Sequence, residues 1–327
     1  MLSRTAEGLF WLGRYIERAE NTARLLEAAR QIDQMPLSSP ELGSEWSAIL
    51  IAAGCRSTYP GDIERADGDS AIRHMIVDDK NPSSIRNCFE AARSNARAQR
   101  IALTIEVWSS INDAWREMRE MTAADCCSGG ELSRILERVR SLAAEFRGSI
   151  TATQLRNAGF DFLRLGEAVE RADATARLLD VKYHVLLPEA LSVGGSYDQL
   201  QWNHILNAAG ARSSYRWVYR AEVSAELVVD FLMLNRQFPR SFSYSFGGIV
   251  RRLERLCEAP ARNQNALLQA TAMKNSLERD SARLILYGGL HEYLTYKIER
   301  TIKLATTIGT DFGFESAAKQ AGNQTQE

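Results

Sequence analysis

The sequence lacks the features of a membrane protein and of a disulfide-rich secreted domain. Charged residues interrupt every apolar stretch before it reaches the roughly 18 residues that a membrane-spanning helix needs. Arg4, Glu7 and Arg14 break up the N-terminal apolar residues, which argues against a signal peptide. The five cysteines contain no CxxC pair, so we expect reduced thiols rather than a metal site or a disulfide framework. These features together predict a cytoplasmic protein.

An excess of positive charge is also missing. The formal net charge is −1, so the chain has no surplus cations to neutralise phosphates, and we expect no nucleic-acid partner. Lysine is scarce, because only 6 of the 40 basic residues are lysine and the others are arginine. Arginine carries a planar donor group that pairs with a carboxylate through two parallel hydrogen bonds. The bias therefore reflects either the codon usage of a GC-rich genome or a real network of Glu–Arg pairs.

Familiar catalytic and metal-binding motifs are absent from the sequence. The chain has four histidines, and none has the glutamate three residues earlier that a di-iron helical bundle requires. The pair His291-Glu292 resembles the start of a zinc-protease motif, but Thr295 stands where the second histidine belongs. No glycine-rich phosphate loop occurs. We expect no metal and no cofactor, and the spacing of residues identifies no catalytic group.

The sequence does contain an internal repeat. Residues 10–28 recur at 163–181 with 10 of 19 positions identical, and residues 46–59 recur at 202–215 with 9 of 14 identical. The offsets between the copies stay within a few residues of 155, which is far longer than the unit of a solenoid protein. The repeat therefore indicates duplication of a unit as large as a domain.

A third match between the copies extends the repeat. Pro82–Phe89 and Pro239–Phe246 share the pattern Pro-x-Ser-x-x-x-x-Phe. We predict a first helical half at 1–150 and a second helical half at 151–312. The remaining residues, 313–327, are polar, and we expect this tail to be disordered.

The spacing of apolar residues is helical along almost the whole chain. A stripe with alternating steps of three and four residues is formed by Leu9, Leu12, Ile16, Ala19, Ala23 and Leu26. Asn81 and Pro82 indicate a helix start, with the asparagine as the N-cap and the proline in the first turn. Strand-type alternation is absent. The fold class predicted is all-α: a duplicated helical bundle with two pseudo-symmetric halves and no significant sheet.

The polar positions that both copies retain are the first candidate binding residues, and those of the first copy are Glu17, Arg18 and Arg24. Their counterparts in the second copy are Glu170, Arg171 and Arg177. Glu20 adds a further carboxylate, and Arg56 and Arg212 are the expected cationic partners of the two repeated glutamates. Two interpretations stay open. The residues form either a half-buried Glu–Arg network that fixes the helix register, or a site for an anion or carboxylate between the halves.

A second set of candidate residues lies only in the first half. It consists of Arg86, Glu90, Arg93, Arg97 and Arg100, which step by 4, 3, 4 and 3 residues. This spacing places four cations and one carboxylate on one face of a helix, where like charges repel unless something compensates them. The stripe is therefore either a solvated helix face or a surface that contacts a partner.

The opening residues MLSRTAEGLFWLGRYIERAENTARLL resemble those of the bacterial alpha-E domain family. The resemblance continues through the Ala-Ala-Gly-x-Arg-Ser block, the Asn-Pro-x-Ser string at 81–84 and the Glu-Arg pair of the second half, and so covers nearly the whole chain. Glu17-Arg18 and Glu170-Arg171 match the Glu-Arg motif after which the family is named. The resemblance implies a helical fold. It transfers no catalytic residue.

The resemblance also implies a biological setting. Members of the family accompany, or are fused to, a circularly permuted ATP-grasp ligase, and often a transglutaminase-like protein. The implied role is a part in ATP-dependent formation of peptide or amide bonds. We expect a non-catalytic helical partner that binds the ligase or presents its substrate, with the arginine stripe as the contact surface. The alternative is an enzyme of amide or peptide modification that uses the Glu-Arg faces.

Overall fold

The computed structural model describes residues 1–34, 45–126, 129–185, 196–258 and 263–315. Regular structure within these ranges is entirely helical, which confirms the predicted all-α fold class. Among the described helices, none combines the length and the apolar character that crossing a membrane requires. Most of the tail that was expected to be disordered lies outside the described residues.

In the first part of the chain, the described residues form seven α-helices and two short 3₁₀ turns. The helices are α1 (Ser3–Asp33), α2 (Glu45–Ala52), α3 (Gly68–Ile76), α4 (Ile85–Ala98), α5 (Ile105–Glu120), α6 (Ala123–Cys126) and α7 (Gly129–Thr153). The 3₁₀ turns are η1 (Ile63–Arg65) and η2 (Arg100–Ala102). α1 packs against α4 and α7. α5 also packs against α4 and α7, on the side away from α1.

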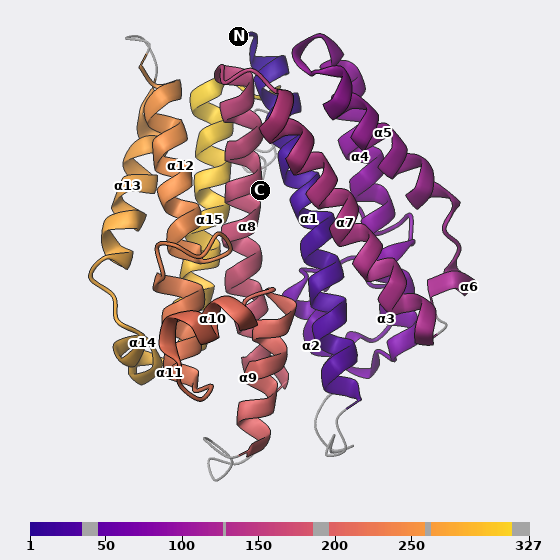
Figure 1. Ribbon diagram of the computed structural model, residues 1–327, viewed down its shortest axis with the longest axis vertical. Helices are drawn as coiled ribbons and strands as arrows, with labels where there is room; N and C mark the ends of the chain where they lie inside the picture. Colours follow the sequence, from indigo (N-terminus) through magenta and orange to yellow (C-terminus); the bar gives the residue numbers. More distant parts are fainter. Residues whose placement is uncertain (35–44, 127–128, 186–195, 259–262, 316–327) are drawn as a thin grey trace, which may run out of the picture.

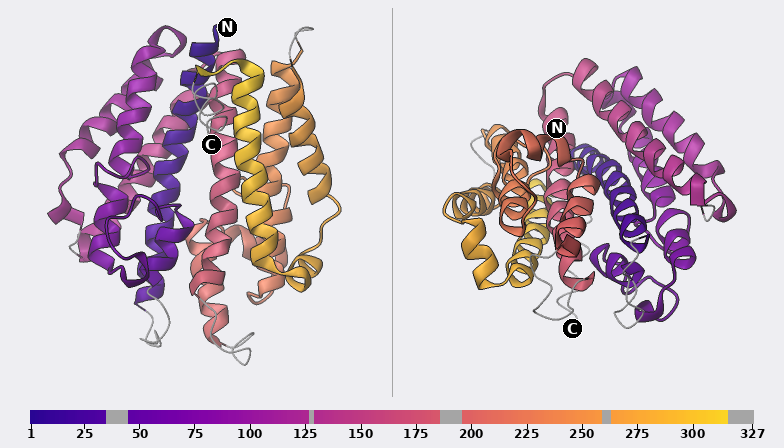
Figure 2. Two further views of the ribbon diagram at one scale, coloured as in Figure 1. Left: turned by 180° about the vertical axis from the view of Figure 1, so that it is seen from behind. Right: turned by 60° about the horizontal axis from the view of Figure 1, so that its bottom comes forward.

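The second part of the chain follows the same plan around its own long helix. Its elements are α8 (Ala158–Val185), α9 (Ser196–Ala208), α10 (Arg212–Tyr219), α11 (Ala225–Val229), the π-helical turn η4 (Asp230–Leu234), α12 (Phe242–Leu256), α13 (Asn265–Leu277), α14 (Ala282–Gly288) and α15 (Leu290–Phe312). α12 and α15 pack against α8, and α13 covers both. α1 and α8 lie side by side at the centre of the molecule (Figures 1 and 2).

The two central helices are buried on almost every side. In α1 the stripe residues Leu12, Ala19, Ala23 and Leu26 have no exposed surface, and residues on the other faces are buried as well. A helix surrounded by partners loses the amphipathic pattern of a surface helix. Each fully buried leucine contributes about 1.5–3 kcal/mol to folding. The centre of the molecule therefore depends on how closely α1 and α8 pack.

That packing is close enough to exclude any side chain at two glycines. A Cβ added to Gly13 would lie 2.1 Å from the carbonyl oxygen of Leu163, and one added to Gly166 would lie 2.0 Å from that of Phe10. The two contacts are reciprocal. Gly13 and Gly166 stand 153 residues apart in the sequence, and so do Phe10 and Leu163. The two copies of the repeat thus meet through the same surface, as in a two-fold symmetric dimer. The boundaries predicted for the two halves stay a prediction.

Equivalent serines begin α4 and α12. The hydroxyl groups of Ser84 and Ser241 each accept a backbone N–H from the first turn of the helix that follows. The prediction that Asn81 is the N-cap of α4 is wrong, because the helix begins three residues later. Asn81 is instead buried, and its side chain accepts from the N–H of Ser83 at 3.0 Å and donates to the carbonyl of His74 at 3.0 Å.

The glycine contact generates a first prediction. Replacing Gly13 or Gly166 by alanine pushes the two backbones apart, and we expect each variant to lose at least about 2–3 kcal/mol of unfolding free energy. Gly148→Ala in α7 is the matched control, because an added Cβ there meets nothing within 4 Å. This control gains about 0.5–1 kcal/mol from helix propensity. Urea unfolding of the three variants measures the difference, and a Gly166→Ala protein as stable as Gly148→Ala contradicts the prediction.

Candidate functional site

The repeated Glu-Arg motif forms two reciprocal ion pairs between α1 and α8. Arg18 donates from Nε and Nη2 to the two carboxylate oxygens of Glu170 at 2.6 and 3.0 Å. Arg171 donates in the same way to Glu17 at 2.9 and 2.6 Å. Each glutamate is therefore held by two parallel hydrogen bonds from the arginine of the other copy, which is the strongest geometry available to this pair. We call this contact between α1 and α8 the central seam.

A second pair of arginines crosses the central seam further along. Arg24 donates from Nη1 to the carbonyl of Ala208 at the end of α9, at 2.7 Å, and Arg177 donates to the carbonyl of Ala52 at the end of α2, at 3.2 Å. Each arginine also binds the carboxylate four residues earlier on its own helix. A cation is favoured at a helix C-terminus, where the backbone carbonyls lack partners. An arginine of each copy thereby caps the C-terminus of a helix that follows the other copy.

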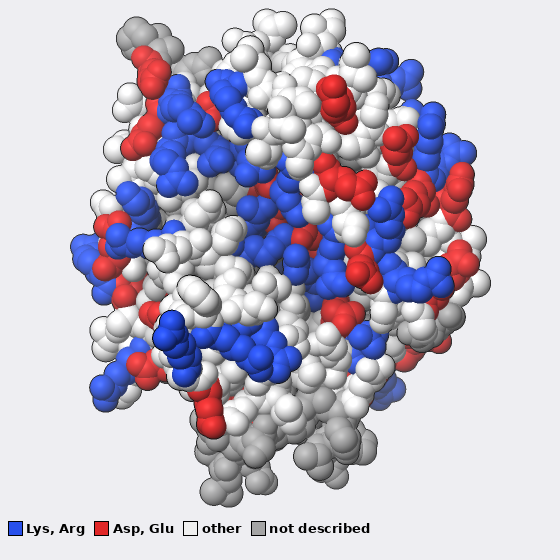
Figure 3. Space-filling model, viewed as in Figure 1, with Lys and Arg blue, Asp and Glu red and all other residues white. Residues whose placement is uncertain are grey.

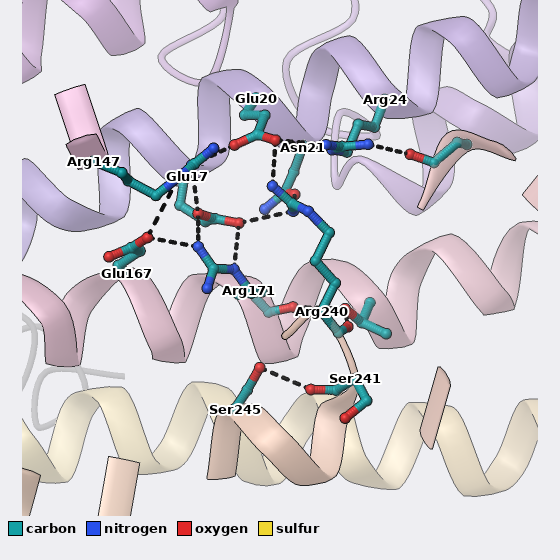
Figure 4. A network of polar contacts seen from close by, with 12 residues as sticks. Glu17, Glu20, Asn21, Arg24, Arg147, Glu167, Arg171, Arg240, Ser241 and Ser245 are labelled. Atoms are coloured by element: carbon teal, nitrogen blue, oxygen red, sulfur yellow. Dashed lines mark hydrogen bonds and ion pairs between the residues drawn. The ribbon is translucent and has the colours of Figure 1, made fainter. Parts of the chain in front are cut away.

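One side of the central seam carries additional charges around Glu17 (Figure 4). Arg240, in the segment before α12, donates to Glu17 at 3.0 Å and also to Glu20. Arg147 of α7 donates to Glu17 at 3.3 Å and also to Glu20. Glu167 of α8 completes the group by accepting from Arg171 at 2.6 Å. Figure 3 shows the surface of this side, where basic side chains surround acidic ones in the middle of the face.

Glu17 and Arg240 stay ionised at neutral pH. Burial by itself raises the pKa of Glu17, which has no exposed surface, but Arg171, Arg240 and Arg147 outweigh it and hold that pKa well below its usual range. Burial lowers the pKa of Arg240 to about 10 despite its two glutamate partners. Glu17 thus has no proton to donate near neutrality. Its arrangement suits a structural clamp rather than an acid catalyst.

The opposite side of the central seam holds fewer charges and a cavity. Arg14 donates from Nε to Glu170 at 2.7 Å, while its guanidinium group lies 4.7 Å from the ring centroid of Trp11. Burial opposes ionisation of Glu170, but Arg18 and Arg14 lower its pKa to about 2. A cavity of about 280 Å³ opens beside these residues, lined also by Asp173 of α8. It lies between the two halves, where the sequence left open a site for an anion or carboxylate.

The structure contradicts the partners predicted for the repeated glutamates. Arg56 is exposed and lies 3.9 Å from Glu64, and Arg212 is exposed at the start of α10. The physical reason is the helix stop in front of each arginine. Gly54 and Gly210 have φ values of 75° and 65°, a left-handed conformation that ends α2 and α9. The repeated Ala-Ala-Gly-x-Arg-Ser block therefore encodes a helix C-cap, and the following arginine projects outward.

The arginine stripe of α4 is not one free surface. Arg86 donates to backbone carbonyls of two neighbouring segments. Arg93 lies 3.8 Å from the ring centroid of Trp115 in α5, and Arg100 lies over a second tryptophan of the same helix. Arg97 is exposed. Backbone carbonyls and aromatic rings thus compensate most of the repulsion between the arginines. The part of the stripe that faces outward is its C-terminal end.

Four charged residues of the central seam were missed by the sequence analysis: Arg14, Arg147, Glu167 and Arg240. None of them is repeated in the other copy, so a comparison of copies contains no signal for them. Arg240 stands where the first copy has Ser83, inside the matched Pro-x-Ser string. In the described part of the chain, no group of three histidine, cysteine, aspartate or glutamate residues is placed to hold a metal ion.

The buried clamp generates a prediction for stability. Glu17→Ala leaves Arg171 and Arg240 without their main partner, and an uncompensated buried charge costs about 3–5 kcal/mol. The control is Glu117→Ala, because Glu117 pairs with Arg138 on an exposed surface. That exchange costs about 0–1 kcal/mol. Denaturant unfolding at neutral pH measures both values, and equal losses for the two variants contradict a structural role of Glu17.

Acid unfolding provides a separate prediction. The pKa of Glu170 is about 2 in the folded protein, against an ordinary value of 4.5. Its ionised form therefore stabilises the fold fully above pH 4.5, and this contribution is lost as the pH falls towards 2. Glu170→Gln removes the titrating group, so its unfolding free energy should fall less than that of the wild type over this interval. Parallel curves for the two proteins, measured by urea unfolding at each pH, refute the expectation.

Comparisons with known proteins match the chain to a helical family and to uncharacterised relatives. A family model described as a predicted alpha-helical domain with a conserved ER motif matches residues 1–312. The chain is similar to uncharacterised proteins of Mycobacterium bovis and Mycobacterium tuberculosis, with 25% identity over 260 residues in each case. The similarity covers 74% of this chain and 28% of each relative, so the chain spans less than a third of the relatives' length. No solved structure matches the chain.

Proposed function

This chain belongs to the alpha-E family, and we propose that it is a non-catalytic helical subunit that binds an ATP-grasp-type peptide or amide ligase and presents substrate to it. The observation that carries the proposal is that the residues of the Glu-Arg motif bind each other. Both glutamates and both arginines of the motif are engaged with each other across the central seam. A motif whose charges are mutually neutralised and buried builds a scaffold. Chemistry is then the task of a partner.

The length of the relatives supports the same proposal. The chain aligns with a fraction of each relative, so in those proteins the alpha-E region is joined to further sequence. A region joined covalently to other parts in some proteins commonly acts beside a separate partner in others. A transglutaminase-like protein is a second partner of the proposed system. The system requires ATP, and we place it in the cytoplasm.

The surface proposed to contact the ligase lies where α4 ends. Ile101 is fully exposed, and Ile105 and Leu155, the latter in the connection from α7 to α8, are largely exposed. These two connections are held together, because Thr104 and Thr153 share a hydrogen bond of 2.7 Å. Together with Arg97 and Arg100 they form the cap surface, defined by Arg97, Arg100, Ile101, Ile105 and Leu155. It lies at the end of the molecule that carries the N-terminus (Figure 1).

The composition of the cap surface suits a protein partner. Contiguous exposed apolar residues with a polar rim are typical of interaction sites, and arginine is enriched in such interfaces. Arg97 and Arg100 favour an acidic rim on the ligase, because complementary charges accelerate association and select the partner. The cap surface retains the end of the arginine stripe expected from the sequence and adds apolar residues that carry no periodic signal.

The alternative function is an enzyme that uses the Glu-Arg faces directly. Such an enzyme needs one of the glutamates to exchange a proton or to contact substrate. Burial raises the pKa values of Glu17 and Glu170, yet their arginine partners hold both values low, which opposes proton exchange near neutral pH. The scaffold function therefore agrees better with the electrostatics of the site.

Co-purification tests the proposed function. Arg97→Glu combined with Arg100→Glu reverses the charge of the cap surface, and we expect recovery of a co-expressed ATP-grasp ligase to fall at least about tenfold, since charge reversal at an interface costs several kcal/mol. Arg134→Glu on α7 is the control, because Arg134 is exposed and lies away from the cap surface. Melting temperatures of both variants should match the wild type.

Two results contradict the proposal. One is co-purification that is unaffected by the reversal at the cap surface. The other is turnover of an amide or peptide substrate by the isolated protein that Glu17→Gln abolishes and the Arg97/Arg100 reversal does not.

A further inference from the structure

The two sides of the central seam are equivalent by the repeat, yet one is filled and the other is open. On the filled side, Arg240 inserts its guanidinium group between Glu17 and Glu20. On the other side the corresponding residues are Ser83 in place of Arg240 and Asp173 in place of Glu20. Serine is too short to occupy the position of an arginine side chain. The side of the seam next to Ser83 therefore stays open, whereas Arg240 fills the equivalent space on the other side.

Cavity volumes agree with this comparison. The space left beside Arg240 is about 20 Å³, which is room for about one water molecule. The cavity on the side of Ser83 measures about 280 Å³, near the lower limit for small-molecule sites. We call it the seam cavity. Its lining includes Ile302 of α15, the helix that packs against α8 (Figure 2, left).

The charged lining of the seam cavity favours an anionic group in the ligand. Arg14, Arg18 and Arg177 face two carboxylates, Glu170 and Asp173, so the lining has one positive charge in excess. Arg14 binds Glu170 through Nε alone, and within the described residues its two terminal nitrogens have no protein acceptor. A ligand that carried only a positive charge would meet three arginines. A carboxylate would instead find free donors on Arg14.

One acceptor in the lining calls for a positively charged group as well. Asp173 accepts from Arg177 at its Oδ2 atom, while Oδ1 is buried and has no hydrogen-bond partner among the described residues. The Nδ2 atom of Asn21 is also buried and has no hydrogen-bond partner among the described residues. A buried polar atom without a partner costs about 1–3 kcal/mol. On the filled side of the seam, the equivalent carboxylate of Glu20 is bound by Arg240.

The rest of the lining is apolar. Leu25, Met75, Ala53 and Ile302 contribute to the wall, together with Cys55. Burial raises the pKa of the Cys55 thiol to about 11, so this thiol is neutral and behaves as a small apolar group. The seam cavity thus combines free donors, a free carboxylate oxygen and an aliphatic wall.

We propose that the seam cavity binds an α-amino acid with an apolar side chain. The carboxylate of the ligand binds Arg14 and Arg18, its ammonium group binds Oδ1 of Asp173, and its side chain packs against Leu25 and Met75. A zwitterion satisfies the unused donors and the unused acceptor at the same time, whereas a simple anion or a simple cation satisfies one of them. An amino acid bound here is then a substrate for the ligase, and this use alone rests on the proposed function. Binding of the amino acid itself needs no partner.

Calorimetric titration of the full chain with L-leucine and two analogues tests the ligand class. 4-Methylpentanoate lacks the ammonium group, and 3-methylbutylamine lacks the carboxylate. We expect L-leucine to bind and each analogue to bind at least about tenfold more weakly, because each loses charge-assisted hydrogen bonds. Equal affinity of 4-methylpentanoate and L-leucine overturns the role of Asp173. Absence of binding by L-leucine, L-methionine and L-valine at millimolar concentrations overturns the proposal.

Two substitutions locate the binding site. Ser83→Arg supplies the guanidinium group that Arg240 supplies on the other side, and it should abolish binding of L-leucine by filling the seam cavity. Ser213→Arg is the matched control, since it adds the same side chain at an exposed position of α10. Asp173→Asn preserves a hydrogen bond to Arg177 and should weaken L-leucine at least about tenfold while leaving 4-methylpentanoate unchanged. Wild-type affinity in both Ser83→Arg and Asp173→Asn overturns the proposal.

The same variants separate this inference from the proposed function. Ser83→Arg should still co-purify with the ligase, because the cap surface is intact. Reversal of Arg97 and Arg100 should leave binding of L-leucine unchanged. A protein that binds the amino acid and no ligase contradicts the proposed function alone, and a protein that binds the ligase and no amino acid contradicts the seam cavity alone.

Discussion

The contact of two helix backbones at Gly13 and Gly166 determines where every charge of the central seam can lie. With no side chain between them, α1 and α8 approach so closely that arginines one turn further along reach glutamates on the opposite helix. The same closeness removes the carboxylates from water. Burying a carboxylate is costly unless it is paired with a cation. The surrounding segments therefore supply further arginines, among them Arg147 and Arg240.

Two similar segments of one chain can carry different residues at equivalent positions, which two identical subunits cannot. In a symmetric homodimer both sides of the interface carry the same residues. Here the reciprocal pairs keep that symmetry, whereas Arg240 and Ser83 break it. On one side, a network of ion pairs joins α1, α7, α8 and the segment before α12. The other side keeps a cavity of about 280 Å³ next to the equivalent pair of Arg18 and Glu170.

The sequence predicted what is repeated or periodic, and missed what is neither. Helical spacing predicted the all-α fold, and the repeat singled out the Glu-Arg pairs of both copies as candidate residues, but it did not predict that these pairs bind each other across the seam. Arg240 and Arg147 reach the seam from segments distant in sequence and have no repeated counterpart, so only packing reveals them. The repeated Arg56 was misinterpreted as a partner of glutamate. It is retained beside a helix stop, and repetition alone does not distinguish a charge that pairs from one that follows a C-cap.

A buried network of this kind contributes more to uniqueness than to stability. Apolar residues of similar volume commonly stabilise a helix pair as well as a buried ion pair does. A smooth apolar seam could slip by one helical turn, however, at small cost. In this protein a slip of α8 along α1 would separate both bidentate pairs and bury their charges without partners. The clamp thus fixes one register, and with it the positions of Arg14, Arg18 and Asp173 around the seam cavity. A ligand then meets groups that are already in place, which lowers the entropy lost on binding.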